Sequence, residues 1–361
     1  MATGRTGTTG SRVAAAIAVA GVVALGLLAA PAGAGAAPEL PPVTAAELVG
    51  SVLAADPGAF GGTVELDNAL GLPPLPDLPQ AANGTSTARV WSDGQGRGRI
   101  QVPTDSGERT FVADGQTFWA WSSADRTVGK AAQRAGEKPA DAPDATTTDP
   151  ITAATEALTE LRTTSAITVD GTAEVASRPA YDLVLAPVPS ERTLLREVRI
   201  AVDAEKRVPL RLTVLANGSS DPALQLGFTA LEFGAQDPSL FTFTPPPGAE
   251  VRDRQRPEDA PAEKPRNAQQ DGPPFVGDGW DTVLVATMAV PTTTPEEGGA
   301  PERGRFGGGP TELSALGTPV SGPWGSGRLI TTAVASAIIT DDGRIAIGAV
   351  PEQVLTEALA Q

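Results

Sequence analysis

The sequence predicts an α+β, mostly β protein, in which a large antiparallel sheet precedes a small C-terminal β-α-β-β-α unit. Apolar and polar residues alternate along the strands between 181 and 228, as they do in strands with one buried face. Earlier in the sequence, Asp93-Gly94 and Asp114-Gly115 separate shorter predicted strands, and the Asp-Gly dipeptide is a strong hairpin signal. Parallel βαβ units are excluded, because no crossover helix separates the strands.

Residues 1–37 have the three-part pattern of a secretory signal peptide. Arg5 and Arg12 precede an apolar run over 13–30, and small residues suited to cleavage follow it. An uncleaved membrane anchor is the alternative, because a run of roughly 18 apolar residues reaches spanning length. We therefore expect an exported, extracytoplasmic protein, either secreted or held in the cell envelope.

Residues 38–251 contain the predicted large sheet and two helices. Thr44 and Glu47 have the spacing of a capping box, which begins a helix that Pro57 ends. A second helix is predicted over 149–162. From there to the end of the region the pattern predicts strands almost without interruption.

One face of the strands between 181 and 228 is entirely apolar or aromatic. Its residues are Tyr181, Leu183, Leu185, Val198, Ile200, Val202, Leu210, Leu212, Val214, Leu224, Leu226 and Phe228. A sheet of about ten strands, spaced by about 4.8 Å, is too wide for two helices to cover. The apolar face is therefore buried in one of two ways: a second layer packs on it, as in a sandwich, or the sheet curls into an incomplete barrel around an apolar ligand.

Residues 252–279 are predicted to form a Pro-rich, charged linker, because large apolar residues are almost absent from them. Residues 280–361 are predicted to form the small unit. Its elements are a strand over 282–288, a short helix over 311–316, a hairpin of strands over 328–340 and 344–350, and a final helix over 351–360. So small a unit would be marginally stable alone, and we expect it to dock on the first domain.

The composition excludes several classes of function. The chain of 361 residues has no Cys and no His, and its formal net charge is −16. Disulfides, thiolate or imidazole metal ligands and a Ser-His-Asp triad are therefore excluded. The acidity argues against a nucleic-acid partner, which needs clustered Lys and Arg. We expect no cofactor, no metal and no enzymatic activity; a carboxylate-based hydrolase is the enzymatic alternative, and no pair of carboxylates marks its site.

Several segments carry a family resemblance. The stretch from Asp237 through Leu240-Phe241-Thr242-Phe243 to Val251 resembles the closing segment of the outer-membrane lipoprotein carrier (LolA) and sigma-E regulatory protein (RseB) superfamily. Phe118-Trp119-Ala120-Trp121 and Pro209-Leu210-Arg211 are similar to two of its strands, and residues 342–351 resemble the end of the regulator's second domain.

The resemblance implies a half-barrel with a helical lid over an apolar cavity and no enzyme activity. It also implies that the cavity binds acyl chains of lipids or lipoproteins, as a carrier or as a sensor. The linker and the small second domain are more similar to the regulator than to the one-domain carrier. For the regulator, the resemblance implies binding to the outer part of a membrane-bound anti-sigma factor.

The candidate ligand-binding residues are apolar, and no catalytic residue is predicted. The predicted cavity wall consists of Trp119, Trp121, Tyr181, Leu183, Leu185, Ile200, Leu212 and Phe228. An ordinary core position is the alternative for the three residues Trp119, Trp121 and Tyr181. A Pro/Leu-rich loop over 70–79 is predicted to form either a flap over the cavity or an exposed apolar contact surface. Its apolar residues are Leu70, Leu72, Leu75 and Leu78.

Overall fold

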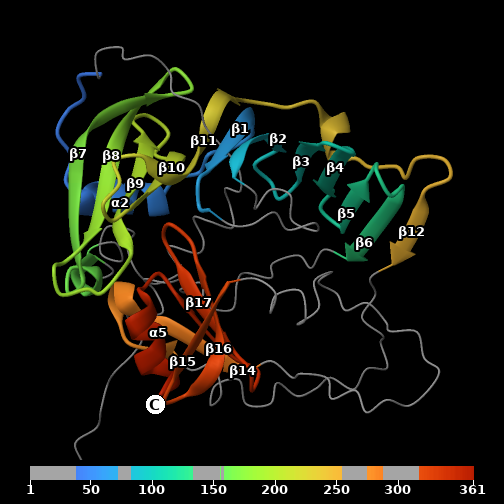
Figure 1. The fold of residues 1–361 in the computed structure, drawn as a ribbon. Helices are drawn as coiled ribbons and strands as arrows, with labels where there is room; N and C mark the ends of the chain where they lie inside the picture. The colour runs from blue at the N-terminus through green and yellow to red at the C-terminus, as the bar shows by residue number, and fades with distance from the viewer. Residues whose placement is uncertain (1–37, 72–82, 133–154, 156–157, 254–274, 288–316) are drawn as a thin grey trace, which may run out of the picture.

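The computed structural model describes residues 38–71, 83–132, 155, 158–253, 275–287 and 317–361. Twelve strands form one open sheet, in the spatial order β12-β6-β5-β4-β3-β2-β1-β11-β10-β9-β8-β7. They are β1 (Phe60–Asn68), β2 (Gly84–Ser92), β3 (Gly98–Thr104), β4 (Gly107–Ala113), β5 (Thr117–Ser122), β6 (Thr127–Ala132), β7 (Ser165–Val175), β8 (Arg178–Pro187), β9 (Leu195–Asp203), β10 (Pro209–Ala216), β11 (Pro222–Phe233) and β12 (Glu250–Asp253). The sheet arches from β7 at one edge to β12 at the other (Figure 1).

The mostly β class and the large antiparallel sheet are confirmed. The sheet has twelve strands where the sequence predicts about ten, and the last pair, β12 with β6, is parallel. Because the twelve strands form an open arch that does not fold back on itself (Figure 1), the two-layer sandwich is wrong. The predicted signal peptide, residues 254–274 of the predicted linker and the first part of the second helix lie outside the described residues. No helix among the residues that the structure describes has the length and apolar character needed to cross a membrane.

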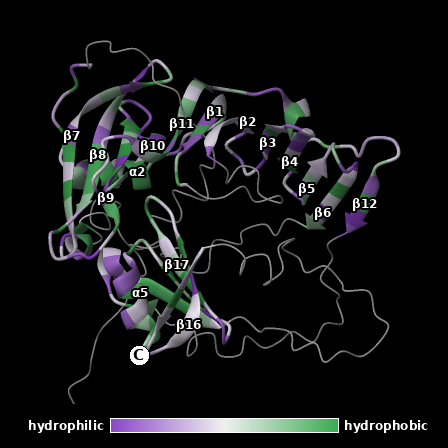
Figure 2. Cartoon of the chain, in the orientation of Figure 1, coloured by the Kyte–Doolittle hydropathy of each residue, from purple (hydrophilic) through white to green (hydrophobic). Residues whose placement is uncertain are grey.

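The pairing register places the alternating apolar residues on one face of the sheet, here called the inner face. Leu183 pairs with Ile200, Ile200 with Leu212, and Leu212 with Leu226. The shared face predicted from the sequence is therefore confirmed for these strands. Figure 2 shows the same alternation of apolar and polar residues along β7 to β10.

Helix α2 (Ala45–Leu53) packs on the inner face over β7, β8 and β9. Its fully buried Leu48 lies in one cluster with Tyr181 and Leu183. The predicted capping box is confirmed: the Glu47 N–H donates to the Thr44 hydroxyl, and the Thr44 N–H donates to the Glu47 carboxylate. Residues 158–161 are also helical, and the structure brings their Leu158 into the same cluster.

The other face of the sheet, here called the opposite face, is covered over β3 to β5 by chain that follows β11. The 3-10 helix η2 (Pro238–Phe241) lies there, with Phe241 almost fully buried. Arg99 Nη1 donates to the Leu240 carbonyl at 3.3 Å. The guanidinium of Arg97 lies 5.3 Å from the centroid of the Phe241 ring, which is within the range of a cation–π contact.

An ion pair with a buried carboxylate joins the start of β8 to the end of β9. Asp203 is fully buried and accepts hydrogen bonds from the Arg178 guanidinium and from the backbone N–H groups of Glu205 and Lys206. Arg178 also lies 4.9 Å over the ring of Phe233, at the end of β11. Burial alone would raise the pKa of Asp203, but these hydrogen bonds outweigh it and hold the pKa below the usual range.

A second sheet has six strands in the order β13-β14-β18-β17-β16-β15. They are β13 (Phe275–Val276), β14 (Val283–Thr287), β15 (Thr318–Gly322), β16 (Gly325–Thr331), β17 (Ser336–Thr340) and β18 (Arg344–Gly348), and a short 3-10 helix, η3 (Gly279–Asp281), precedes β14. Helix α5 (Glu352–Leu359) packs on one face, where Leu355, Ile338 and Val283 are fully buried.

The predicted strand composition of this small domain is wrong in part. The sequence predicts three strands, but residues 328–340 divide into β16 and β17 around a turn, and β13 and β15 were not foreseen. The hairpin across residues 341–343 and the C-terminal helix are confirmed. The predicted helix over 311–316 and the excursion over 291–310 lie outside the described residues.

The loop between β8 and β9 joins the two sheets. The Thr193 hydroxyl and the Leu194 N–H both donate to the Ala349 carbonyl, at 2.6 and 2.8 Å. The Trp280 backbone N–H donates to the Glu191 carboxylate at 2.8 Å. These contacts confirm that the small domain docks on the first domain.

Two further contacts extend this docking. The Trp280 indole N–H donates to the Ser165 hydroxyl, at the start of β7, at 2.7 Å. The turn between β16 and β17 reaches the end of β1, where the Ala333 N–H donates to the Leu70 carbonyl at 2.9 Å. The small domain therefore contacts the large sheet at β7, at the β8–β9 loop and after β1.

Candidate functional site

The inner face carries an apolar row that crosses the central strands. The register pairs Ala120 with Phe111, Phe111 with Ile100, and Ile100 with Val90. Val90 pairs in turn with Gly62, and Gly62 with Leu231. We call these six residues the inner row. Their strands are β5, β4, β3, β2, β1 and β11, so the row crosses half of the large sheet.

The inner row is only partly covered at its β3–β5 end. Ile100 is 42% exposed, and Phe118, which lies beside the row on β5, is 43% exposed. Phe111 and Phe118 stack with their ring centroids 6.2 Å apart. Exposed aromatic and aliphatic side chains that touch one another form an apolar surface of the kind that binds apolar partners or ligands.

Gly62 makes room in the row for an aromatic cluster. A Cβ atom at this position would lie 2.9 Å from the Phe228 ring and 2.7 Å from the Ala230 carbonyl oxygen. With only hydrogen there, the Phe228 ring lies across β1 and meets Phe60 edge to face, with their centroids 6.2 Å apart. The glycine is therefore required for close packing on the inner face.

Six of the eight predicted wall residues lie on the inner face, in two groups. Tyr181, Leu183, Leu185 and Ile200 belong to the cluster beneath α2. Leu212 continues their row, and Phe228 lies in the cluster of β1, β2 and β3. Tyr181 and Leu183 are already buried by α2, so the surface left open lies farther along the sheet, at β3 to β5.

Tyr181 also holds the segment that precedes α2. Its hydroxyl donates to the Pro41 carbonyl at 2.9 Å, and the Thr172 hydroxyl donates to the Pro38 carbonyl at 2.7 Å. The Arg207 guanidinium lies 5.1 Å from the Tyr181 ring centroid. Tyr181 therefore anchors the entry to α2 as well as packing in the cluster.

Trp119 and Trp121 lie on the opposite face, away from the other six predicted residues. Trp119 pairs with Val112, and Trp121 pairs with Thr110, whereas the inner-row residue Phe111 lies between these partners. The Trp119 indole N–H donates to the Asp114 carboxylate at 2.9 Å, and its ring lies 5.6 Å from that of Phe243. The eight predicted residues therefore do not form one wall, and Phe111 and Phe118 take the places of the two tryptophans on the inner face.

The predicted flap can be placed at one residue only. Leu70 follows β1, and its carbonyl accepts the hydrogen bond from Ala333 in the small domain. Leu72, Leu75 and Leu78 lie outside the described residues.

Three charged groups of β8, β9 and β10 lie together on the opposite face. Asp182 pairs with Ala201, whose other partner is Arg211, and Arg199 lies two residues before Ala201 on the same face. Burial raises the pKa of Asp182, and the charges of Arg211 and Arg199 oppose this rise. Among the described residues, no group of His, Cys, Asp or Glu has an arrangement that could hold a metal ion.

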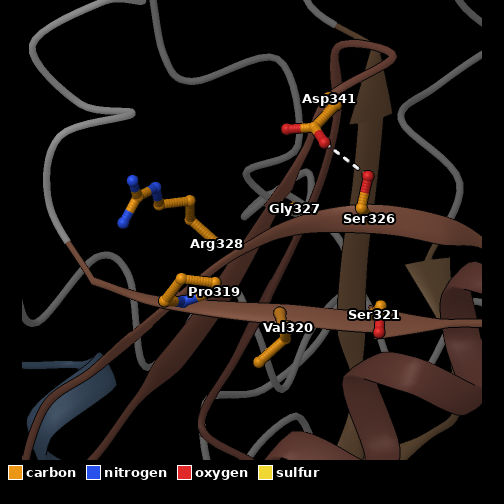
Figure 3. Close-up of a pocket in the computed structure, with 7 residues that line it drawn as sticks. All are labelled: Pro319, Val320, Ser321, Ser326, Gly327, Arg328 and Asp341. Atoms are coloured by element: carbon orange, nitrogen blue, oxygen red, sulfur yellow. Dashed lines mark hydrogen bonds between the residues drawn. The ribbon is translucent and has the colours of Figure 1, made fainter.

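Two of the pockets lined by described residues involve the small domain. The first, of about 440 Å³, is lined by Pro319, Val320, Ser321, Ser326, Gly327, Arg328 and Asp341 (Figure 3). The second, of about 170 Å³, lies where Arg192 of the β8–β9 loop meets α5 and Asp281. Neither pocket is lined by a residue of the predicted cavity wall.

Comparison with known proteins gives structural matches only. No protein-family model and no curated protein sequence matches the chain. The complex of MucA and MucB from Pseudomonas aeruginosa is 17% identical, and the alignment covers 88% of this chain and 96% of that chain with a TM-score of 0.44. A crystal structure of MucB with MucA(peri) is also 17% identical, with 88% and 97% covered and a TM-score of 0.44.

A LolA superfamily protein from Nitrosomonas europaea is similar to part of the chain. It is 11% identical, and the alignment covers 56% of this chain and 99% of that chain with a TM-score of 0.25. These matches carry the names towards which the sequence resemblance points.

Proposed function

We propose that this chain is a non-enzymatic, extracytoplasmic protein that binds an acyl chain of a lipid or lipoprotein on its inner face. The bound chain lies along the β3–β5 part of the inner row, against Ile100, Phe111 and Phe118. The observation that carries this proposal is the contiguous, partly exposed apolar surface at those three residues. Export depends on the signal-peptide pattern of residues 1–37.

A hydrocarbon chain fits the chemistry of this surface. The backbone groups of β3, β4 and β5 are already paired with neighbouring strands on both sides, so they offer no hydrogen bonds to a peptide. Every member of the inner row is apolar, and burial of apolar area then supplies the binding free energy, at about 25 cal/mol per Å². A ligand that needs no hydrogen bonds is favoured over one that does.

The helices on the inner face leave this part of the sheet to the ligand. Helix α2 and residues 158–161 pack over β7 to β9, at the other end of the arch. In this proposal, α2 is the helical lid implied by the sequence resemblance, and Tyr181 and Thr172 anchor its entry segment.

The experiment uses the mature chain from residue 38 and a fluorescent fatty-acid methyl ester, a neutral probe with one acyl chain. Saturable binding that weakens in Phe118→Ala, but not in Val251→Ala, supports the proposal. Val251 is a suitable control because it is 46% exposed and lies on β12, at the edge of the sheet. Absence of saturable binding to the wild-type chain would contradict the proposal.

A second candidate is binding to the outer segment of a membrane-bound anti-sigma factor. It is favoured by the second sheet docked on the first and by residues 342–351, which form the turn, strand and entry to α5 that resemble the regulator's second domain. The test is co-purification of membrane proteins with this chain from detergent-solubilised envelope membranes. The outer segment of any single-pass protein recovered is then purified and titrated with the chain. A chain that binds the acyl probe but no such segment is a carrier rather than a regulator.

A further inference from the structure

The small sheet has an apolar face that no described helix covers. Helix α5 packs on the face of Val283, Ile338 and Ala346. The residues between these point to the other side of the sheet, here called the outer face. A row of paired residues crosses five strands on this face: Phe275, Leu284, Ile347, Ala337 and Ile330. Phe275 is 63% exposed and Ile347 is 44% exposed, so this row is open to solvent.

A second row runs parallel to the first and ends in a cation. Ala286 pairs with Ile345, Ile345 with Ile339, and Ile339 with Arg328. Arg328 is the only Lys or Arg on the outer face of the described strands. The other arginine of this sheet, Arg344, points to the helix side, where it donates to the carbonyls of Leu359 and Trp324.

Arg328 lies beside a pocket at the same edge of the sheet. The pocket has a volume of about 440 Å³, and the hydroxyls of Ser321 and Ser326 lie on its lining (Figure 3). Ser326 donates its hydrogen bond to Asp341, on the side of the pocket away from Arg328. Arg328 Nη1 donates to the Gly317 carbonyl at 3.1 Å, and a guanidinium has five N–H donors, so within the described part of the chain most remain for a ligand.

We propose that the outer face binds a single-chain amphiphile with a carboxylate head group, of the fatty-acid class. The carboxylate is held by the Arg328 guanidinium, whose fork matches its two oxygens. The chain crosses Ile339 and Ile345 towards Ala286, with the first row along its side. The path from Arg328 to Ala286 spans three strand spacings, about 14 Å in all.

Two features select this ligand among other amphiphiles and peptides. A phosphate monoester carries close to two negative charges at neutral pH, and a pocket lined by one arginine and one aspartate, Asp341, matches a singly charged head better. The backbone groups of β14, β18, β17 and β16 are paired on both sides, so an extended peptide cannot add a strand over the middle of this face. The site is separate from the inner row and does not depend on the function proposed for it.

The test titrates the full mature chain with cis-parinaric acid, a fluorescent fatty acid, and with its methyl ester. The Arg328→Gln variant is expected to bind the free acid about tenfold more weakly or worse, as loss of a charge-assisted hydrogen bond predicts. Arg328→Gln is expected to bind the ester as the wild type does. Ile339→Thr, which keeps the β-branched shape, is expected to weaken binding of the free acid and to leave binding of the ester, the probe of the inner face, as in the wild type.

Two controls make the result decisive. Arg252→Gln removes an exposed arginine on β12 and is expected to bind the free acid as the wild type does. The inner-face variant Phe118→Ala is expected to keep the discrimination between acid and ester. Equal affinity of Arg328→Gln and wild type for the acid overturns the proposal, as does absence of acid binding to the wild type. Loss of all acid binding in Phe118→Ala alone assigns the ligand to the inner face and also overturns it.

Discussion

Substitution of Phe118 by alanine tests the inner-face site directly. A buried phenylalanine contributes about 200 Å² of contact area. With 43% of Phe118 exposed, roughly 85 Å² remains for a ligand to cover. At about 25 cal/mol per Å², this area corresponds to about 2 kcal/mol, or up to about thirtyfold in the dissociation constant.

The assay is fluorescence titration of the methyl-ester probe into the wild type, Phe118→Ala and Val251→Ala. The unfolding free energy of each variant is measured separately in urea, because loss of the stacking with Phe111 costs about 1 kcal/mol of stability on its own. A thirtyfold loss in Phe118→Ala with wild-type affinity in Val251→Ala supports the site. A dissociation constant within twofold of wild type for Phe118→Ala, in a protein that binds the probe, would refute the reasoning.

Two further predictions concern ionisable groups. Asp203→Asn removes the buried carboxylate that binds the half-buried Arg178 guanidinium and is expected to lower the unfolding free energy by about 2 kcal/mol in urea titration. Because the folded-state pKa of Asp203 is lowered, its contribution is present above pH 3.8 and lost as the pH falls further, so wild type and variant should converge in acid. Burial raises the pKa of Glu191 at the domain interface; the Trp280 N–H opposes this rise and the charge of Asp281 adds to it. Docking of the small domain should therefore be strongest below pH 4.5 and weaken as the pH rises through the raised pKa of Glu191. Glu191→Gln should therefore match wild type in thermal melts in acid and exceed it at neutral pH; equal melting at both values would show that Glu191 does not control docking.

Local sequence signals predicted the elements whose causes are local. The capping box fixed the start of α2, and the hairpin turns fell where an aspartate precedes a glycine or lies two residues before one. The apolar inner face of β8 to β11 was predictable from alternation alone, because these strands are consecutive in the sequence and each pairs with the next.

Long-range contacts were not predictable in this way. The parallel pairing of β12 with β6 joins residues that are more than 120 positions apart, and neither strand has a pattern that specifies the other. The strands β13 and β15 are short, and glycine and proline lie next to β13 and within β15, which weakens the strand signal. The division of residues 328–340 into β16 and β17 occurs at Thr332, whose side chain binds the backbone of Ala335 and closes a turn.

The assignment of the aromatic residues of β5 shows what alternation can decide and what it cannot. It separates Phe118 from Trp119, but it does not tell which of them is on the inner face. Strand β3, which is separated from β5 by β4, contains the missing signal, because Ile100 and Val102 alternate there with Arg99 and Gln101. Hairpin pairing carries the Ile100 side through Phe111 to Ala120, and so to Phe118.

The two tryptophans are nevertheless apolar and large, because the opposite face is covered at that point. The covering chain is η2 with Phe243, more than 100 residues farther along the sequence. A strand that is apolar on both faces has something packed on each, and in this protein only one cover belongs to the described chain. The face without a described cover is that of Phe118, and it is the face on which we propose that an external apolar ligand binds.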